Sequence, residues 1–135
     1  MYRNIVVPIA LDHAHTPEEA LRVARRLLSE GGKITALHVM EPLPRHVAQY
    51  LPAQQHDIHV ADLKARMAKA LGPDAGVASA VIEGHAGRAI VEFAEDIGAD
   101  LIVVASHRPG LQDYLLGSTA ARVVRHAQAC VHVLR

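Results

Sequence analysis

Cysteine, aromatic residues and net charge are what this sequence has least of. Its 135 residues include a single cysteine, Cys130, so neither an intramolecular disulfide nor a cysteine metal site can form. One unpaired cysteine is typical of the cytoplasm, where we expect the protein to act. Aromatic residues make up 3%, and fourteen basic residues balance fourteen acidic ones. Without net charge, no overall field attracts nucleic acid, so no nucleic-acid partner is expected.

Long apolar runs are absent as well. No stretch approaches the ~20 apolar residues of a membrane span, and the opening segment has no long apolar region before a cleavage site. We therefore expect no membrane partner and no export. Half of the residues are hydrophobic and 21% are charged, which is a globular composition. The length suits one domain covering residues 1–135.

Ten histidines are many for this length and raise the question of a metal site. His13 and His15 lie two apart, and His56 and His59 lie three apart. No carboxylate or cysteine completes a familiar ligand pattern around either pair. The sequence therefore predicts no metal site.

Short apolar runs alternate with helical patterns along the chain. The predicted strands are residues 4–10, 34–40, 77–83, 101–105 and 130–135. This alternation is typical of a doubly wound sheet, so we predict a single-domain α/β fold with an open, parallel five-stranded sheet in the order 3-2-1-4-5. Strands one and four are the most continuously apolar and are therefore expected at the centre.

The predicted helices begin and end at recognisable signals. Residues 16–19 read Thr-Pro-Glu-Glu, a capping box that starts the first helix, and Gly31-Gly32 is expected to end it. Residues 57–71 are predicted as the second helix. Residues 41–55 contain three prolines and are predicted to be a loop that acts as a mobile lid.

Residues 100–119 contain the pattern that best suggests a binding site. The uninterrupted apolar run 101–105 indicates a strand buried on both faces. Gly117 then precedes a helical pattern, with Ser118 as its natural cap. A helix start leaves N–H groups unpaired and carries roughly half a positive charge, so it can bind phosphate. Alternatively, Ser118 only caps the helix and the glycines, Gly110 included, only supply turns.

The predicted strand order places a site beside this helix start. The winding reverses between strands one and four, and ligands of open α/β sheets bind outside the carboxyl ends at such a reversal. The end of strand two lies on the far side of that crevice. The candidate binding residues are Pro8, Ile9, Ala10, Asp12, Val39, Met40, Gly84, Ala105, Ser106, His107, Arg108, Gly110, Gly117, Ser118 and Thr119.

Five short segments together resemble the universal stress protein family. They are Val7-Pro8-Ile9, Leu37-His38-Val39, Ser106-His107-Arg108-Pro109, Leu115-Leu116-Gly117-Ser118 and Val124-Arg125-His126-Ala127. The resemblance covers essentially the whole chain and is most specific in its last third. It implies a Rossmann-like α/β fold, a homodimer and, in one branch of the family, ATP bound at the switch point.

The nucleotide-binding branch carries a glycine, two residues, a second glycine, nine residues, and then glycine with Ser or Thr. Gly117 and Ser118 match the end of this motif. Counting back from them places Val104 and His107 at the earlier glycines, whereas aligning by the strand end places Ala105 at the first glycine and leaves the loop one residue short. The match to the motif is therefore partial.

A subset of the family carries a Ser-His-Arg-Pro loop, as this chain does from Ser106. The resemblance implies that Ser106, His107 and Arg108 line the phosphates, where side-chain donors replace glycine amides. It also implies that the adenine hydrogen-bonds to the backbone of Val39. Family members usually place an Asp where this chain has Ala10, and the nearest carboxylate that could replace it is Asp12, two residues further on.

Two functions remain open. The first is an ATP-binding stress-response regulator, in which Mg²⁺ or Mn²⁺ accompanies ATP and turnover is at most slow hydrolysis or self-phosphorylation. The second is a dimeric protein-interaction module of the same fold that binds no nucleotide. The Gly117-Ser118 pair favours the first, and Ala10 favours the second.

A dedicated adenylating or hydrolytic enzyme is not expected. Residues 11–13 offer one carboxylate, Asp12, where such an enzyme needs acidic metal ligands, and no Gly-x-Ser-x-Gly elbow is present. A catalytic triad of Asp12, His107 and Ser118 is not expected, because polar residues at a switch point more often position phosphates.

The final apolar run, residues 129–134, is predicted to be an edge strand. An unpaired edge favours pairing with its own copy about a twofold axis, so we expect a homodimer through this strand. The alternative is a monomer whose edge is blunted by His132 and Arg135.

Overall fold

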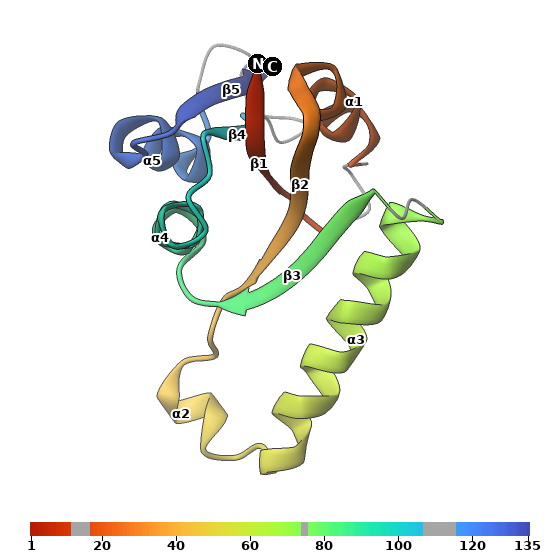
Figure 1. Ribbon diagram of the computed structural model, residues 1–135. Helices are drawn as coiled ribbons and strands as arrows, with labels where there is room; N and C mark the ends of the chain where they lie inside the picture. The colour runs from red at the N-terminus through yellow and green to blue at the C-terminus, as the bar shows by residue number, and fades with distance from the viewer. Residues whose placement is uncertain (12–16, 74–75, 107–115) are drawn as a thin grey trace.

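The computed structural model describes residues 1–11, 17–73, 76–106 and 116–135. They form one parallel sheet with helices on both faces (Figure 1). The strands are β1 (Tyr2–Pro8), β2 (Leu28–Met40), β3 (Val77–Glu83), β4 (Leu101–Ala105) and β5 (Cys130–Leu134). Their order is β3-β2-β1-β4-β5, with every neighbouring pair parallel. The predicted fold class and strand order are confirmed.

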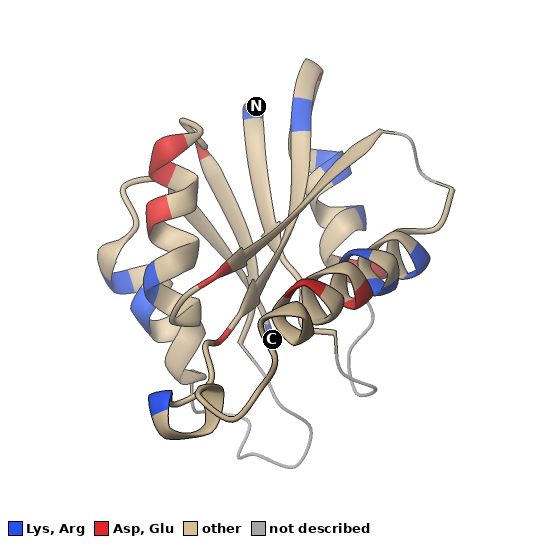
Figure 2. Ribbon diagram, turned by 90° about the horizontal axis from the view of Figure 1, so that it is seen from below, with Lys and Arg blue, Asp and Glu red and all other residues tan. Residues whose placement is uncertain are grey.

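The described helices are α1 (Glu18–Leu27), α2 (Arg45–Ala48), α3 (Ala53–Leu71), α4 (Ala86–Asp96) and α5 (Ser118–His126). Four of them cover the two faces of the sheet in pairs. In Figure 1, α1 and α3 lie on one side of the sheet, and α4 and α5 lie on the other. Lys and Arg are interspersed with Asp and Glu over the helices, as the balanced composition suggests (Figure 2). None of the helices in the described ranges is long and apolar enough to span a membrane.

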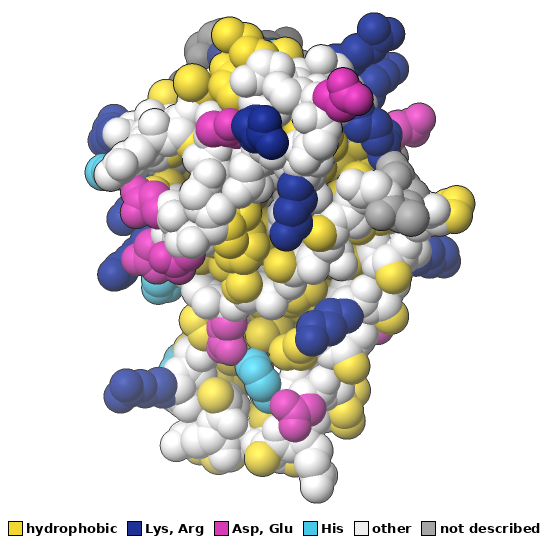
Figure 3. All heavy atoms as spheres, in the orientation of Figure 1, with side chains coloured by type: hydrophobic (Ala, Val, Ile, Leu, Met, Phe, Trp, Pro, Cys, Tyr) yellow, Lys and Arg dark blue, Asp and Glu magenta, His cyan; other side chains and the backbone are white. Residues whose placement is uncertain are grey.

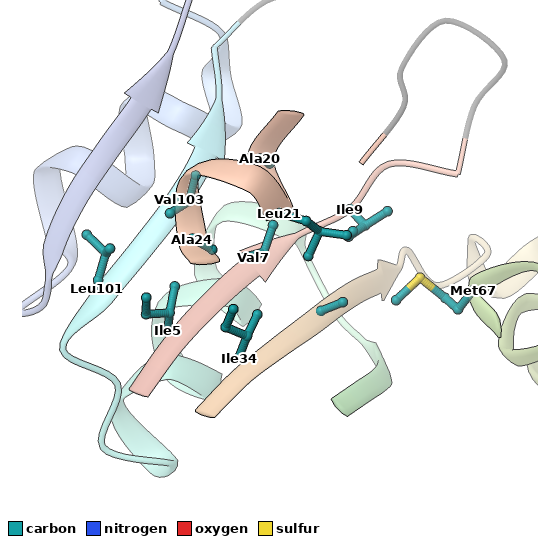
Figure 4. Close-up of a cluster of buried hydrophobic side chains, with 11 residues drawn as sticks. Ile5, Val7, Ile9, Ala20, Leu21, Ala24, Ile34, Met67, Leu101 and Val103 are labelled. Atoms are coloured by element: carbon teal, nitrogen blue, oxygen red, sulfur yellow. The ribbon is translucent and has the colours of Figure 1, made fainter. Parts of the chain in front are cut away.

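Strand β1 is central because its side chains are apolar on both faces. Ile5 and Val7 point into the core formed with α1, which Figure 4 shows in close-up. Val6 points into the second core, formed with α4 and α5. All three side chains are fully buried. A strand of this kind is stable only when it is covered on both sides, so it occupies the middle of the sheet as predicted.

Asp100 fastens the amino ends of the strands together. Its carboxylate accepts hydrogen bonds from the backbone N–H groups of Arg3 (2.9 Å) and Asn4 (3.0 Å). Its own N–H donates to the Asn4 carbonyl at 2.9 Å. Desolvation alone would raise the pKa of this carboxyl, but the backbone N–H donors outweigh it and hold the pKa below its ordinary value. Ionised Asp100 therefore stabilises the junction of β1 and β4.

The first helix ends earlier than predicted. It stops at Leu27, and Gly31 lies inside β2, where the register with β1 shifts between Tyr2 and Asn4. The φ angle of Gly31 is +78°, a conformation that residues with a side chain seldom adopt. The glycine therefore serves a bulge in a strand and not the end of a helix. The predicted cap, Thr16, lies outside the described residues.

The segment that follows β2 is more helical than predicted. Instead of an irregular loop over residues 41–55, the chain forms α2 and begins α3 at Ala53, before the predicted helix start at residue 57. We call residues 41–59 the arm. Every residue of the arm is exposed, including large apolar side chains such as Tyr50 (81%) and Ile58 (59%). Figure 3 shows hydrophobic side chains at the surface where the arm forms the bottom of the molecule.

We predict that the arm has the lowest stability among the described segments of the nucleotide-free protein. It contributes no buried side chain to either core, so little free energy opposes its local opening. Hydrogen exchange should show its amides exchanging on the order of a thousandfold faster than those of β4. Equal protection of the arm and β4 would contradict this expectation.

Replacing Asp100 with Asn should destabilise the fold by about 1 kcal/mol at pH 7, because an amide supplies one acceptor where two N–H groups need one each. The native pKa is lowered, so the contribution is present above the ordinary value of 3.8 and disappears as the pH falls through the native pKa. Urea unfolding at several pH values measures the difference. The matched control is Asp62→Asn on the exposed side of α3. A difference between wild type and Asp100→Asn that is unchanged at low pH would refute the assignment.

Candidate functional site

The ends of β4 and β5 and the start of α5 are fastened to one another. Ser106 is buried, and both its N–H and its hydroxyl donate to the Leu134 carbonyl at 2.9 Å. The Ser106 carbonyl in turn accepts the N–H of Gly117 at 3.0 Å. The chain thus leaves β4 at Ser106 and returns to the same point at Gly117. These bonds fix the first turn of α5 at the carboxyl end of β4.

The first turn of α5 presents free backbone donors. The first N–H to bond within the helix is that of Ala121, which donates to the Gly117 carbonyl at 2.8 Å. The N–H groups of Ser118 and Thr119 donate to no group within the described ranges. The first turn holds no acidic residue, and Ser118 is exposed. Within the described residues, nothing neutralises the positive end of the helix dipole, and such an end can bind an anion.

Two details of this helix start differ from the prediction. Ser118 is the first helical residue and not the cap, and no side chain of the described residues caps the helix. The N–H of Gly117, which the sequence suggests as a phosphate donor, is occupied by Ser106. Gly117 has an ordinary φ of −58°, so it supplies no special turn conformation. A Cβ there would lie 3.0 Å from the Ser106 oxygen, so the glycine allows this close approach.

The backbone after β1 is held by side chains from other elements. The N–H of Ile9 donates to the Leu37 carbonyl at 2.7 Å. The Ile9 carbonyl oxygen lies 2.8 Å from Nδ1 of His38, and the Leu11 carbonyl accepts a hydrogen bond from Nη2 of Arg66 at 2.6 Å. Sequence reasoning missed both roles. The apolar periodicity of α3 gives no sign of Arg66, and His38 enters only through the segment that carries the family resemblance.

The backbone of Val39 faces the end of β1. The Met40 carbonyl accepts the N–H of Gly84 at 3.0 Å, on the β3 side of β2. The Leu37 carbonyl accepts the Ile9 N–H on the opposite side. Because backbone groups alternate between the two sides of a strand, the N–H and C=O of Val39 point the same way as those of Leu37. They therefore lie beyond the last residue of β1 that pairs with β2.

Most described candidate residues gather at the carboxyl edge of the sheet. Pro8 ends β1, and Ile9 and Ala10 follow it. Val39 and Met40 end β2, whereas Ala105 ends β4 and Ser106 follows it. Gly84 lies one strand further from the β1/β4 reversal, and its N–H is used by Met40. The hydroxyl of Ser106 uses its one hydrogen on Leu134, so it has no donor left for a phosphate.

The remaining candidates cannot be placed, because Asp12, His107, Arg108 and Gly110 lie outside the described residues. Within the described part of the chain, no three His, Cys, Asp or Glu side chains gather as metal ligands would. The described site therefore consists of backbone donors and acceptors around the reversal between β1 and β4. Such a site can bind and orient a polar ligand.

Solved structures share this fold over almost the whole chain. The hypothetical protein MJ0577 is 27% identical, with a TM-score of 0.76 over 99% of this chain and 96% of that one. A universal stress protein in complex with cAMP is 21% identical, with a TM-score of 0.62, and covers 99% and 97% of the two chains. The universal stress protein from Archaeoglobus fulgidus in complex with dAMP is 19% identical, with a TM-score of 0.65, and covers 99% and 98%.

The family is established by sequence. Universal stress protein G of Escherichia coli O157:H7 is 30% identical over an alignment of 142 residues, which covers all of both chains. The model of the universal stress protein family matches residues 1–135. The chain belongs to the universal stress protein family.

Proposed function

We propose that this chain is an ATP-binding regulator of the stress response, with the nucleotide at the reversal between β1 and β4. The observation that carries the proposal is the open start of α5, where the N–H groups of Ser118 and Thr119 have no partner within the described residues. Their position beside the end of β4 is where an open α/β sheet binds its ligands.

The helix start suits the phosphates of the nucleotide. Backbone N–H groups and the helix dipole both favour negative charge, and each charge-assisted hydrogen bond contributes about 1.5–3 kcal/mol. Ser118 and Thr119 supply two such donors, and their hydroxyls add two more. Gly117 contributes by letting the helix start approach Ser106, and not by its own N–H. In this proposal, Mg²⁺ or Mn²⁺ accompanies the phosphates.

The end of β2 suits the base. The N–H and C=O of Val39 point the same way, toward the end of β1, which matches the acceptor N1 and the donor amino group of adenine. Two neighbours of the same fold are complexes with the adenine nucleotides cAMP and dAMP. Shared fold does not by itself transfer a ligand, so the argument depends on the backbone groups of this chain.

The alternative function is an interaction module without nucleotide. The exposed Ala10, where family members usually carry an Asp, favours this alternative. The start of α5 favours nucleotide binding, because its first N–H groups have no partner among the described residues and lie beside the carboxyl end of β4. Nucleotide binding decides between them.

We predict that ATP at a hundredfold excess over its dissociation constant stabilises the wild type by about 2.7 kcal/mol and raises the melting midpoint by about 10 °C. Ser118→Pro should weaken ATP binding about tenfold or more, because it removes one N–H donor. Proline is favoured at the first helical position, and Gly117, at ψ 153°, has the conformation that precedes proline, so the fold should survive. Ser118→Ala keeps the N–H and should cost less.

The matched control is Ala53→Pro at the first position of α3, where Pro52 at ψ 146° has the same compatible conformation. This variant should bind ATP as the wild type does. Calorimetry with and without Mg²⁺ measures the affinities. No binding of millimolar ATP by the wild type would refute the proposal, and the interaction module would then take its place.

We also propose that the protein is a homodimer through β5, the edge strand beside β4. The Cys130 N–H and the Leu134 carbonyl bond toward β4. Because backbone groups alternate along a strand, the N–H and C=O of His132 also point toward β4, whereas those of Val131 and Val133 point to the free edge. The substitution that the pattern alone suggests, His132→Pro, would therefore break the sheet within one subunit.

Val133→Pro is the variant that removes a donor from the free edge, where proline is tolerated. We expect it to convert the dimer into a folded monomer, whereas His132→Pro should unfold at lower temperature. Light scattering over a dilution series, combined with thermal unfolding, measures both effects. A wild-type protein of monomer mass at high concentration would contradict the dimer.

A further inference from the structure

His38 makes a contact that an ordinary parallel sheet lacks. Its Nδ1 lies 2.8 Å from the carbonyl oxygen of Ile9, the residue directly after β1. A carbonyl oxygen can only accept, so Nδ1 carries the hydrogen and donates it. The ring is only partly exposed, and it belongs to β2, the strand that runs beside β1. The contact therefore ties the two strands together by a side chain.

This contact stands where a backbone bond would be expected. The Ile9 N–H donates to the Leu37 carbonyl, and a parallel ladder would continue with the Val39 N–H donating to the Ile9 carbonyl. No such bond exists, and the pairing of β1 with β2 ends at Pro8 opposite Leu37. The imidazole has taken the acceptor that Val39 would otherwise use.

We propose that His38 is a positioning residue that keeps the backbone of Val39 open for a nucleotide base. By engaging the Ile9 carbonyl, it turns the chain away from β2 after one bond and leaves the Val39 N–H and C=O without a backbone partner on the β1 side. The proposal rests on nucleotide binding at this site. In the same base orientation, guanine would oppose donor to donor and acceptor to acceptor, so the open edge also selects adenine.

The direct test is hydrogen exchange at the Val39 amide in the nucleotide-free protein. His38→Leu removes the donor, so the ladder should extend and the Val39 amide should exchange at least about tenfold more slowly than in the wild type. His38→Asn keeps a side-chain donor and should exchange as the wild type does. The Ile9 amide, bonded to Leu37 in all three proteins, is the internal control. Equal rates at Val39 in the wild type and His38→Leu would overturn the proposal.

The second test compares ATP with inorganic triphosphate by calorimetry. His38→Leu should bind ATP at least about tenfold more weakly, with His38→Asn restoring the affinity, while triphosphate affinity stays the same in all three. An equal loss for both ligands would show that His38 supports the fold and not the base site. If the wild type binds no ATP, the proposed function fails, and the exchange of the Val39 amide still decides the role of His38.

Discussion

The burial of β1 on both faces is the constraint from which the rest of the structure follows. Ile5 and Val7 enter one core and Val6 enters the other, so helices must cover both faces and strands must flank both edges. With β2 on one side and β4 on the other, the chain has to reverse its winding direction at β1. Open α/β sheets bind their ligands at such a reversal, so the same packing that stabilises the fold also determines where the proposed site lies.

The site itself is made from what the ladders leave unpaired. Beyond the last pairs of the sheet, other hydrogen bonds replace those of the ladder. The Ser106 carbonyl accepts the N–H of Gly117, and the side chains of His38 and Arg66 bond to the backbone after β1. The first N–H groups of α5 then have no partner among the described residues, and the backbone of Val39 lies beyond the last pair of β1 with β2. In the proposed function, recognition by backbone groups would make little use of the side chain at position 10, where this chain has Ala10.

The sequence predicted the architecture well because its signals are collective. An apolar run such as 101–105 reports burial on both faces, and an alternation of strands and helices leaves few topologies. Single residues were harder to assign. Gly31 carries the same signal whether it ends a helix or forms a bulge, and Ser118 resembles a cap whether or not it precedes the helix. Only the three-dimensional register distinguishes these alternatives.

Contacts between distant segments were beyond the reach of local pattern. Arg66 and Leu11 are 55 residues apart, and nothing near either residue in the sequence indicates that they meet. The bond between Gly117 and Ser106 depends on how the chain returns to the end of β4, which periodicity does not determine. Such contacts decide which backbone donors stay free. They therefore change which backbone atoms the predicted site can use, and the position of the site stays a prediction.

The central claim is that free backbone groups of α5 and β2 bind the two ends of one adenine nucleotide. The most direct measurement is a titration of the ¹⁵N-labelled protein with ATP, followed through the amide resonances. The account predicts that Ser118, Thr119 and Val39 shift together with one dissociation constant, while Gly117, whose N–H is occupied by Ser106, moves less. The account would be contradicted if the resonances of these three amides stayed unchanged, or if resonances shifted only at the amino edge of the sheet around Asp100.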